Sequence, residues 1–98
     1  MEIRIQPIHF DVSQQLESFI QKKIFKLEKY HDGIIAADVV LKVVKPESAM
    51  NKDVSVRLEA PGPDFYATKT SNTFEEAIDS VVEALEKQLL KYKEKLRK

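Results

Sequence analysis

The chain contains no cysteine, and only two of its 98 residues are glycine. Without cysteine there is no disulfide framework, thiol catalysis, zinc ribbon or iron–sulfur site, and His9 and His31 are left as the only soft metal ligands. Gly33 and Gly62 stand alone and build neither a Walker loop nor a G-x-G-x-x-G turn, which argues against nucleotide-dependent catalysis. We therefore expect no metal and no cofactor.

Long hydrophobic runs are also missing. The apolar stretches are short, interrupted by charge, and far below the ~20 apolar residues that a membrane-spanning helix requires. The sequence begins MEIRIQPIHF, which lacks the basic, apolar and small-residue parts of a secretory signal. We therefore expect a cytoplasmic protein with no membrane partner. A length of 98 residues with 43% hydrophobic content predicts a single domain, spanning 1–98, with one core.

Charge is balanced in total but distributed unevenly along the chain. There are 16 basic and 16 acidic side chains, yet Lys87 to Lys98 carries six cations against one anion. This segment therefore has a net charge of +5 and the preceding 86 residues a net charge of −5. A second local excess of lysine lies between Lys22 and Lys29.

Apolar spacing predicts the element order β-α-β-β-β-α. Residues 2–6 alternate as a half-buried strand, and Pro7 places this strand at a sheet edge. Ser13 is the expected N-cap of a helix that ends near Asp32, where Gly33 is expected to supply the left-handed closing residue.

Three further strands and a second helix follow. The strand at 36–44 turns Ala37, Val39, Leu41 and Val43 inward, and the next strand turns Val54, Val56, Leu58 and Ala60 inward. The turn at 61–64 leads into an alternating strand from Phe65 to Thr70, which indicates a hairpin. Thr73 and Glu76 predict a capping box, after which Ile78, Val82, Leu85, Leu89, Tyr92 and Leu96 form one apolar stripe. These patterns predict an α+β fold, in which both helices pack on one face of a four-stranded, mainly antiparallel sheet.

Lysines on the outer faces of the two helices are candidate nucleic-acid contacts. On the last helix, Lys87, Lys91, Lys95 and Lys98 lie opposite the apolar stripe, and Lys93 and Arg97 lie on a flank. On the first helix, Lys22, Lys26 and Lys29 form a second stripe, and Lys23 borders the apolar face. This spacing suits successive phosphates of a nucleic-acid backbone. The alternative is a solvated helix end whose lysines interact favourably with the helix dipole.

Other side chains admit two interpretations. Phe25 lies among the lysines and either stacks on a base or packs on a neighbouring loop. The open sheet face carries Val40, Lys42, Val44, Arg57, Tyr66 and Thr68, and is either a second contact surface or an ordinary wet face. His9 and His31 have no serine or carboxylate at the spacing of a catalytic triad, so we expect loop and helix-end roles and no enzymatic activity.

The chain resembles the short ribosome hibernation-promoting factors, also called ribosome-associated inhibitor A or sigma-54 modulation proteins. The resemblance rests on the run from Ser13 to Tyr30, the strand VVLKV, and AID followed by KQLLKYKEKL. It implies a double-stranded-RNA-binding-domain-like fold that enters the tRNA and mRNA channel of the small ribosomal subunit and blocks the A and P sites under stress or in stationary phase. It also implies that the partners are the small subunit and its rRNA, with no small-molecule substrate.

The resemblance carries basic positions over to this chain. Lys23, Lys26, Lys42, Lys91, Lys93 and Lys95 match basic positions of the family, and Lys87 stands where arginine or lysine is usual. The full predicted rRNA-binding set is Lys22, Lys23, Lys26, Lys29, Lys42, Lys87, Lys91, Lys93, Lys95 and Lys98. The chain departs from the family at 73–76, in the third strand and in the loop 45–53. Because it ends at Lys98, we expect no C-terminal dimerisation domain and a monomer when free.

Two other functions fit the same residues. A general double-stranded-RNA binder would bind a plain duplex as well as it binds a ribosome. A protein-interaction module using the exposed sheet would bind with little dependence on salt and would tolerate neutralisation of the lysines.

Overall fold

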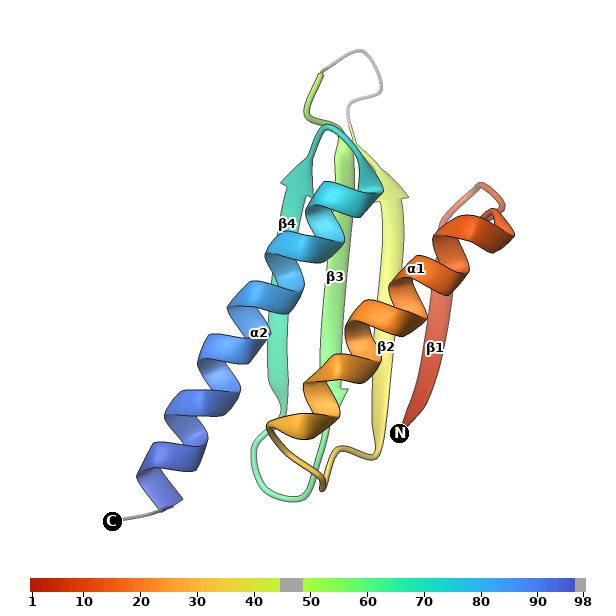
Figure 1. Ribbon diagram of the computed structural model, residues 1–98. Helices are drawn as coiled ribbons and strands as arrows, with labels where there is room; N and C mark the ends of the chain where they lie inside the picture. The colour runs from red at the N-terminus through yellow and green to blue at the C-terminus, as the bar shows by residue number, and fades with distance from the viewer. Residues whose placement is uncertain (45–48, 97–98) are drawn as a thin grey trace.

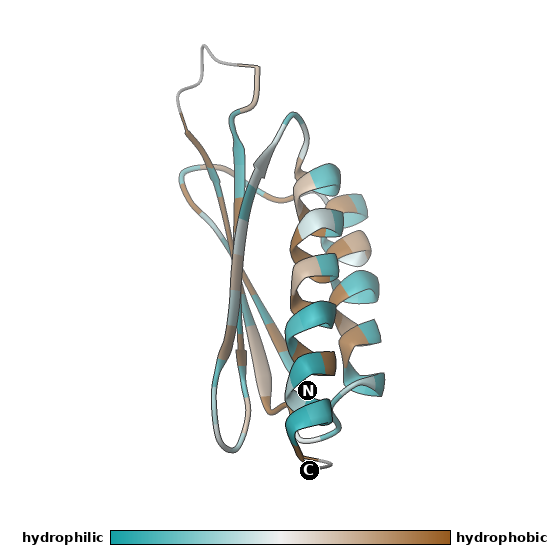
Figure 2. Ribbon diagram, turned by 90° about the vertical axis from the view of Figure 1, so that its left-hand side faces the viewer, coloured by the Kyte–Doolittle hydropathy of each residue, from teal (hydrophilic) through white to brown (hydrophobic). Residues whose placement is uncertain are grey.

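The computed structural model describes residues 1–44 and 49–96. The elements are β1 (Glu2–Pro7), α1 (Gln14–Phe25), the 3₁₀ helix η1 (Lys26–Lys29), β2 (Ala36–Val43), β3 (Lys52–Glu59), β4 (Phe65–Ser71) and α2 (Phe74–Leu96). The two helices lie next to each other over one face of the sheet (Figure 1). Seen from the side, the sheet and the helices form two layers (Figure 2). The predicted fold class and element order are confirmed.

The four strands are ordered β1-β2-β3-β4, so the strand that contains Pro7 lies at an edge as predicted. β1 pairs with β2 in parallel, and the other two pairings are antiparallel. The parallel pair follows from the connection, because α1 crosses over the sheet between β1 and β2. Ile5, Val39, Val56 and Ala67 stand opposite one another across the sheet and project to the same face, which is the one the helices cover.

The core lies between the sheet and the helices. Its fully buried side chains include Val39, Leu41, Val54, Val56 and Leu58 from the sheet and Ile20, Ile24, Leu85 and Leu89 from the helices. Two predicted core residues are corrected, because Val43 is 40% exposed and Leu96 is 69% exposed. Both are the last residues of their elements, where the opposite layer no longer covers them.

The helix starts are close to prediction. The Ser13 hydroxyl accepts a hydrogen bond from the Leu16 N–H at 3.1 Å, and the Thr73 hydroxyl accepts one from the Glu76 N–H at 3.1 Å. Within the described ranges, the Glu76 carboxylate makes no return bond to Thr73, so only one half of the expected capping box forms. Neither helix of the described chain has the length and apolarity of a membrane span.

The end of the first helical segment differs from the prediction. The helix tightens into η1 at Lys26, and the glycine with positive φ is Gly62, at 89° in the β3–β4 turn, rather than Gly33. Position 33 requires a small residue for another reason. A Cβ atom there would lie 2.8 Å from Cε1 of His31.

Candidate nucleic-acid interface

The α1 lysine group consists of Lys22, Lys23, Lys26 and Lys29, at the C-terminal end of the first helical segment. Lys22, Lys26 and Lys29 are exposed, and none of them forms an ion pair with another described residue. The Lys23 Nζ atom lies 3.3 Å from Oδ1 of Asp79 and 5.5 Å from the centre of the Phe19 ring. Lys23 is thus partly committed to holding α1 against α2, whereas the other three are available to an external anion.

The α2 lysine group consists of Lys87, Lys91, Lys93 and Lys95, and all four side chains are exposed. Lys87 Nζ lies 3.6 Å from Oε1 of Glu83 in a pair whose partners are both about 70% exposed, so solvent weakens it. The other three have no carboxylate partner among the described residues. Lys98, also predicted to bind rRNA, lies outside the described residues, as does Arg97.

The two lysine groups lie on neighbouring helical segments. The contact between Lys23 and Asp79 sets the last turn of α1 against the first half of α2. Lys87 follows Asp79 by eight residues, which is about 12 Å along a helix axis. The half of α2 that precedes Lys87 is acidic, with Glu75, Glu76, Asp79, Glu83 and Glu86. The basic part of α2 therefore begins beyond the position of the contact between Lys23 and Asp79.

Lys91 and Lys95 face the β4 side of α2. With Pro63, Phe65, Gln88 and Tyr92 they line a hollow of about 300 Å³ beside the β3–β4 turn. The Gln88 amide anchors this flank by donating a hydrogen bond of 2.8 Å to the carbonyl oxygen of Tyr66. These lysines are therefore presented from a helix whose position is fixed by both core packing and a bond to the sheet edge.

Many polar and charged side chains on the open face of the sheet pair with one another. The Arg4 guanidinium donates to Asp38 at 2.6 Å, and this hydrogen bond raises the pKa of Arg4 above its ordinary value. Arg57 donates to Asp64 at 3.1 Å and lies 3.6 Å from Asp38. Ser55 and Thr68 hydrogen-bond each other at 3.1 Å.

The remaining open-face residues predicted from the sequence differ in their exposure to solvent. Val40 and Val44 are half-buried, whereas Lys42 and Tyr66 are exposed. Lys42 has no carboxylate partner in the described parts of the chain. Among the described members of the predicted rRNA-binding set, Lys42 alone projects from the sheet rather than from a helix, so it lies apart from both lysine groups.

His31 belongs to an aromatic cluster that the sequence did not indicate. Its Nδ1 atom accepts a hydrogen bond of 3.1 Å from the Gly33 N–H. The imidazole stacks on Tyr92 with ring centres 5.6 Å apart and meets the edge of Phe65 at 6.0 Å. Across residues 1–44 and 49–96, no group of three or more His, Asp or Glu side chains is placed to hold a metal ion.

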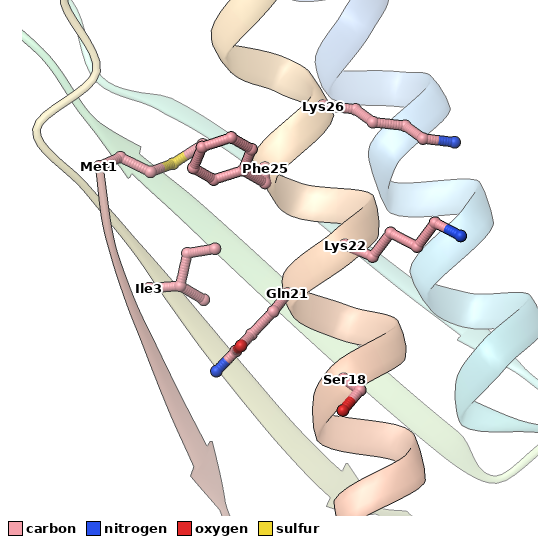
Figure 3. A pocket seen from close by; sticks show the side chains of 7 residues that line it. All are labelled: Met1, Ile3, Ser18, Gln21, Lys22, Phe25 and Lys26. Atoms are coloured by element: carbon pink, nitrogen blue, oxygen red, sulfur yellow. The ribbon is translucent and has the colours of Figure 1, made fainter.

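Phe25, which the sequence placed among the lysines, is 55% exposed. It stands on the wall of a groove of about 710 Å³ between α1 and β1, with Met1 and Ile3 on the opposite side. Its side chain points toward Met1, whereas Lys22 and Lys26 point away from it (Figure 3).

Comparison with known proteins agrees with this architecture. Residues 3–97 match the family described as sigma 54 modulation protein / S30EA ribosomal protein. The chain therefore belongs to this family, which confirms the resemblance seen in its sequence.

Individual relatives carry more particular names. The chain is 30% identical over 95 residues to the ribosome hibernation promoting factor of Pseudomonas putida, covering 97% of this chain and 89% of the relative. It is 31% identical over 97 residues to that of Escherichia coli K12, covering 99% and 98%.

Solved structures show the same fold. A ribosomal subunit interface protein from Coxiella burnetii superposes with a TM-score of 0.85 at 26% identity, covering 95% of this chain and 98% of that one. The N-terminal domain of Thermus thermophilus Protein Y has a TM-score of 0.80 at 22% identity, covering 94% and 99%.

Proposed function

We propose that the protein is a ribosome hibernation factor that binds small-subunit rRNA and excludes tRNA and mRNA by occupying their sites. One observation carries the proposal. In a chain related to ribosome hibernation promoting factors, the lysines on the outer faces of both helices are exposed and mostly lack carboxylate partners among the described residues.

Phosphate binding is the chemistry that these lysines supply. Each ammonium group that meets a phosphate releases condensed counterions, so affinity falls steeply with salt. Recognition would come from shape and backbone contacts, which is the usual mode for structured RNA. Inhibition follows from excluded volume, and no bond is made or broken.

Sucrose-gradient sedimentation with purified small subunits tests the binding. We expect co-sedimentation at about 50 mM salt and a loss of affinity of about 10³-fold or more at about 200 mM, as about six phosphate contacts would give. The variant with Lys87, Lys91, Lys93 and Lys95 all changed to Glu should keep the wild-type circular-dichroism spectrum but no longer sediment with subunits. Unchanged sedimentation of this variant would refute the proposed surface.

The same assay separates the alternatives. Equal affinity for a plain RNA duplex and for subunits would indicate a general double-stranded-RNA binder. Binding that is insensitive to salt and survives the four reversals would indicate a protein-interaction module.

Occlusion needs its own measurement. We expect filter-bound initiator tRNA on programmed small subunits to fall as protein is added, and to reach its minimum near one protein per subunit. If tRNA remains bound when the protein saturates the subunits, the protein binds elsewhere and occlusion is wrong.

A further inference from the structure

The groove between α1 and β1 combines apolar, amide and cationic chemistry. It measures about 710 Å³, and its apolar part consists of Met1, Ile3 and the Phe25 ring. Ser18 and Gln21 add a hydroxyl and a side-chain amide from α1 to its lining. Figure 3 shows Gln21 and Phe25 projecting from α1 toward the β1 side.

Phe25 is poorly buried for an aromatic side chain, since 55% of it is exposed. On the helical wheel it lies on the opposite face from the buried Ile20 and Leu27, so rotating α1 to cover the ring would expose the core. The groove is also open along the edge strand β1, where no further strand of the described chain pairs. The ring therefore presents a flat apolar face to solvent.

Two cations lie across α1 from this apolar face. Lys22 and Lys26 line the groove and belong to the α1 lysine group. Neither pairs with a carboxylate of the described residues, and both point to the opposite side of α1 from Phe25 (Figure 3). A ligand seated here meets a flat ring and an amide on one side of the helix and two ammonium groups on the other.

We infer that this groove receives an unstacked base of an RNA strand, and that the strand crosses over α1 so that other phosphates of its backbone reach Lys22 and Lys26 on the far side of the helix. The inference rests on the proposed function and adds a subsite to it. A base offers the flat surface that stacks on an aromatic ring and edge groups that an amide or hydroxyl can hydrogen-bond. The Ser18 hydroxyl and the Gln21 amide in the lining favour RNA over an acidic peptide with an apolar side chain, because such a side chain has no group for them to hydrogen-bond.

Fluorescence gives a direct test because the chain contains no tryptophan. The F25W variant places a single tryptophan in the groove, and a base stacked on it should quench its emission. The probe is a ten-nucleotide single-stranded RNA without self-complementarity, in dilute buffer. The same strand annealed to its complement, and a peptide of glutamate and leucine, serve as the other two ligands. We expect quenching by the single strand and much less by the duplex or the peptide.

The matched control is Y66W. Tyr66 is 54% exposed, almost the same as Phe25, but lies on the open sheet face. Its tryptophan should not respond to the single strand. Equal quenching at both positions, or quenching of F25W by the peptide and not by RNA, would overturn the inference.

Small subunits provide the second readout. F25A should weaken binding by roughly 5- to 150-fold, the range for loss of one base–aromatic stack. The slope of affinity against salt should stay unchanged, because no charge is removed. F25W should restore binding, and wild-type affinity in F25A would contradict the subsite. If the wild-type protein itself fails to bind subunits, the proposed function is wrong. The oligonucleotide measurement then still tests whether the groove binds a base.

Discussion

The charged side chains on the two faces of this molecule are used in opposite ways. On the open face of the sheet, Arg4 and Arg57 each contact two carboxylates. On the outer side of the helices, Lys22, Lys26, Lys91 and Lys95 have no carboxylate partner in the described chain. The arginines of the sheet face are thus paired within the molecule, whereas these helix-face lysines are not.

The arrangement of the unpaired cations also has a cost. Lys22 and Lys26 are separated by four residues, as are Lys91 and Lys95. Like charges at this spacing destabilise a helix by about 0.2–0.5 kcal/mol per pair. The repulsion is offset because these lysines lie near the C-terminal ends of their helical segments, where cations interact favourably with the helix dipole. The spacing is therefore compatible with a surface for an anionic ligand and with a solvated helix end.

Apolar contacts should carry most of the stability of the helix layer on the sheet. Leu85 is fully buried, so Leu85→Ala should lower the free energy of unfolding by about 2–5 kcal/mol in urea denaturation. Leu90→Ala, at a site 44% exposed on the same helix, is the control and should change it by about 0.5 kcal/mol or less. Similar losses in both variants would show that burial does not decide the stability of this helix.

Cations of the helix face should contribute more to subunit binding than cations of the sheet face. Changing Lys91 and Lys95 to Gln should weaken binding roughly 10- to 100-fold at about 0.1 M salt and reduce the salt slope by about 2. Changing Arg4 and Arg57 to Gln removes the same charge from the sheet face and should leave both quantities nearly unchanged. Titration of labelled protein with small subunits at several salt concentrations measures both, and equal losses would contradict the assignment of faces.

The acidic start of α2 should affect the stability of the protein, and its basic end should affect subunit binding. Thr73→Ala removes the cap on the Glu76 N–H and should cost about 1 kcal/mol of stability. Subunit affinity should stay unchanged at a temperature where the variant is fully folded, because the lysines lie at the other end of the helix. A parallel fall in affinity would mean that the helix start contacts the ribosome.

The smallest effect concerns the sheet-face ion pairs. Arg57 is 49% exposed, and its partners Asp38 and Asp64 are also partly exposed. Arg57→Ala should therefore lower the free energy of unfolding by at most about 1 kcal/mol, and the loss should shrink in high salt. A larger, salt-independent loss would show that the side chain acts through packing.

Local patterns predicted the elements well because burial in this fold repeats with the period of each element. Val54, Val56 and Leu58 alternate in sequence and are all fully buried. Val43 and Leu96 continue their patterns but are exposed, because the extent of the opposite layer is not encoded locally. Gly33 was misassigned for a similar reason, since its size is set by the His31 ring packed against it.

The candidate site was predictable in its side chains but not in their partners. Helical spacing identified the outward lysines, and the structure shows those it describes to be exposed or half-buried. Helical spacing could not reveal that Lys23 pairs with Asp79, which lies 56 residues further along the chain. The groove at Phe25 was equally inaccessible, because it exists only where β1 and α1 meet in three dimensions.

The oblique course of α2 has a mechanical consequence. Its C-terminal turns run out beyond β4, and the exposed Leu96 marks where the supporting layer has ended (Figure 1). Because the helix extends in this way, its C-terminal end is accessible from all sides rather than from one side. With Lys91 and Lys95 on one flank and Lys93 on the other, such a tip is suited to a narrow crevice with negatively charged walls on both sides, and a flat surface would engage only part of it.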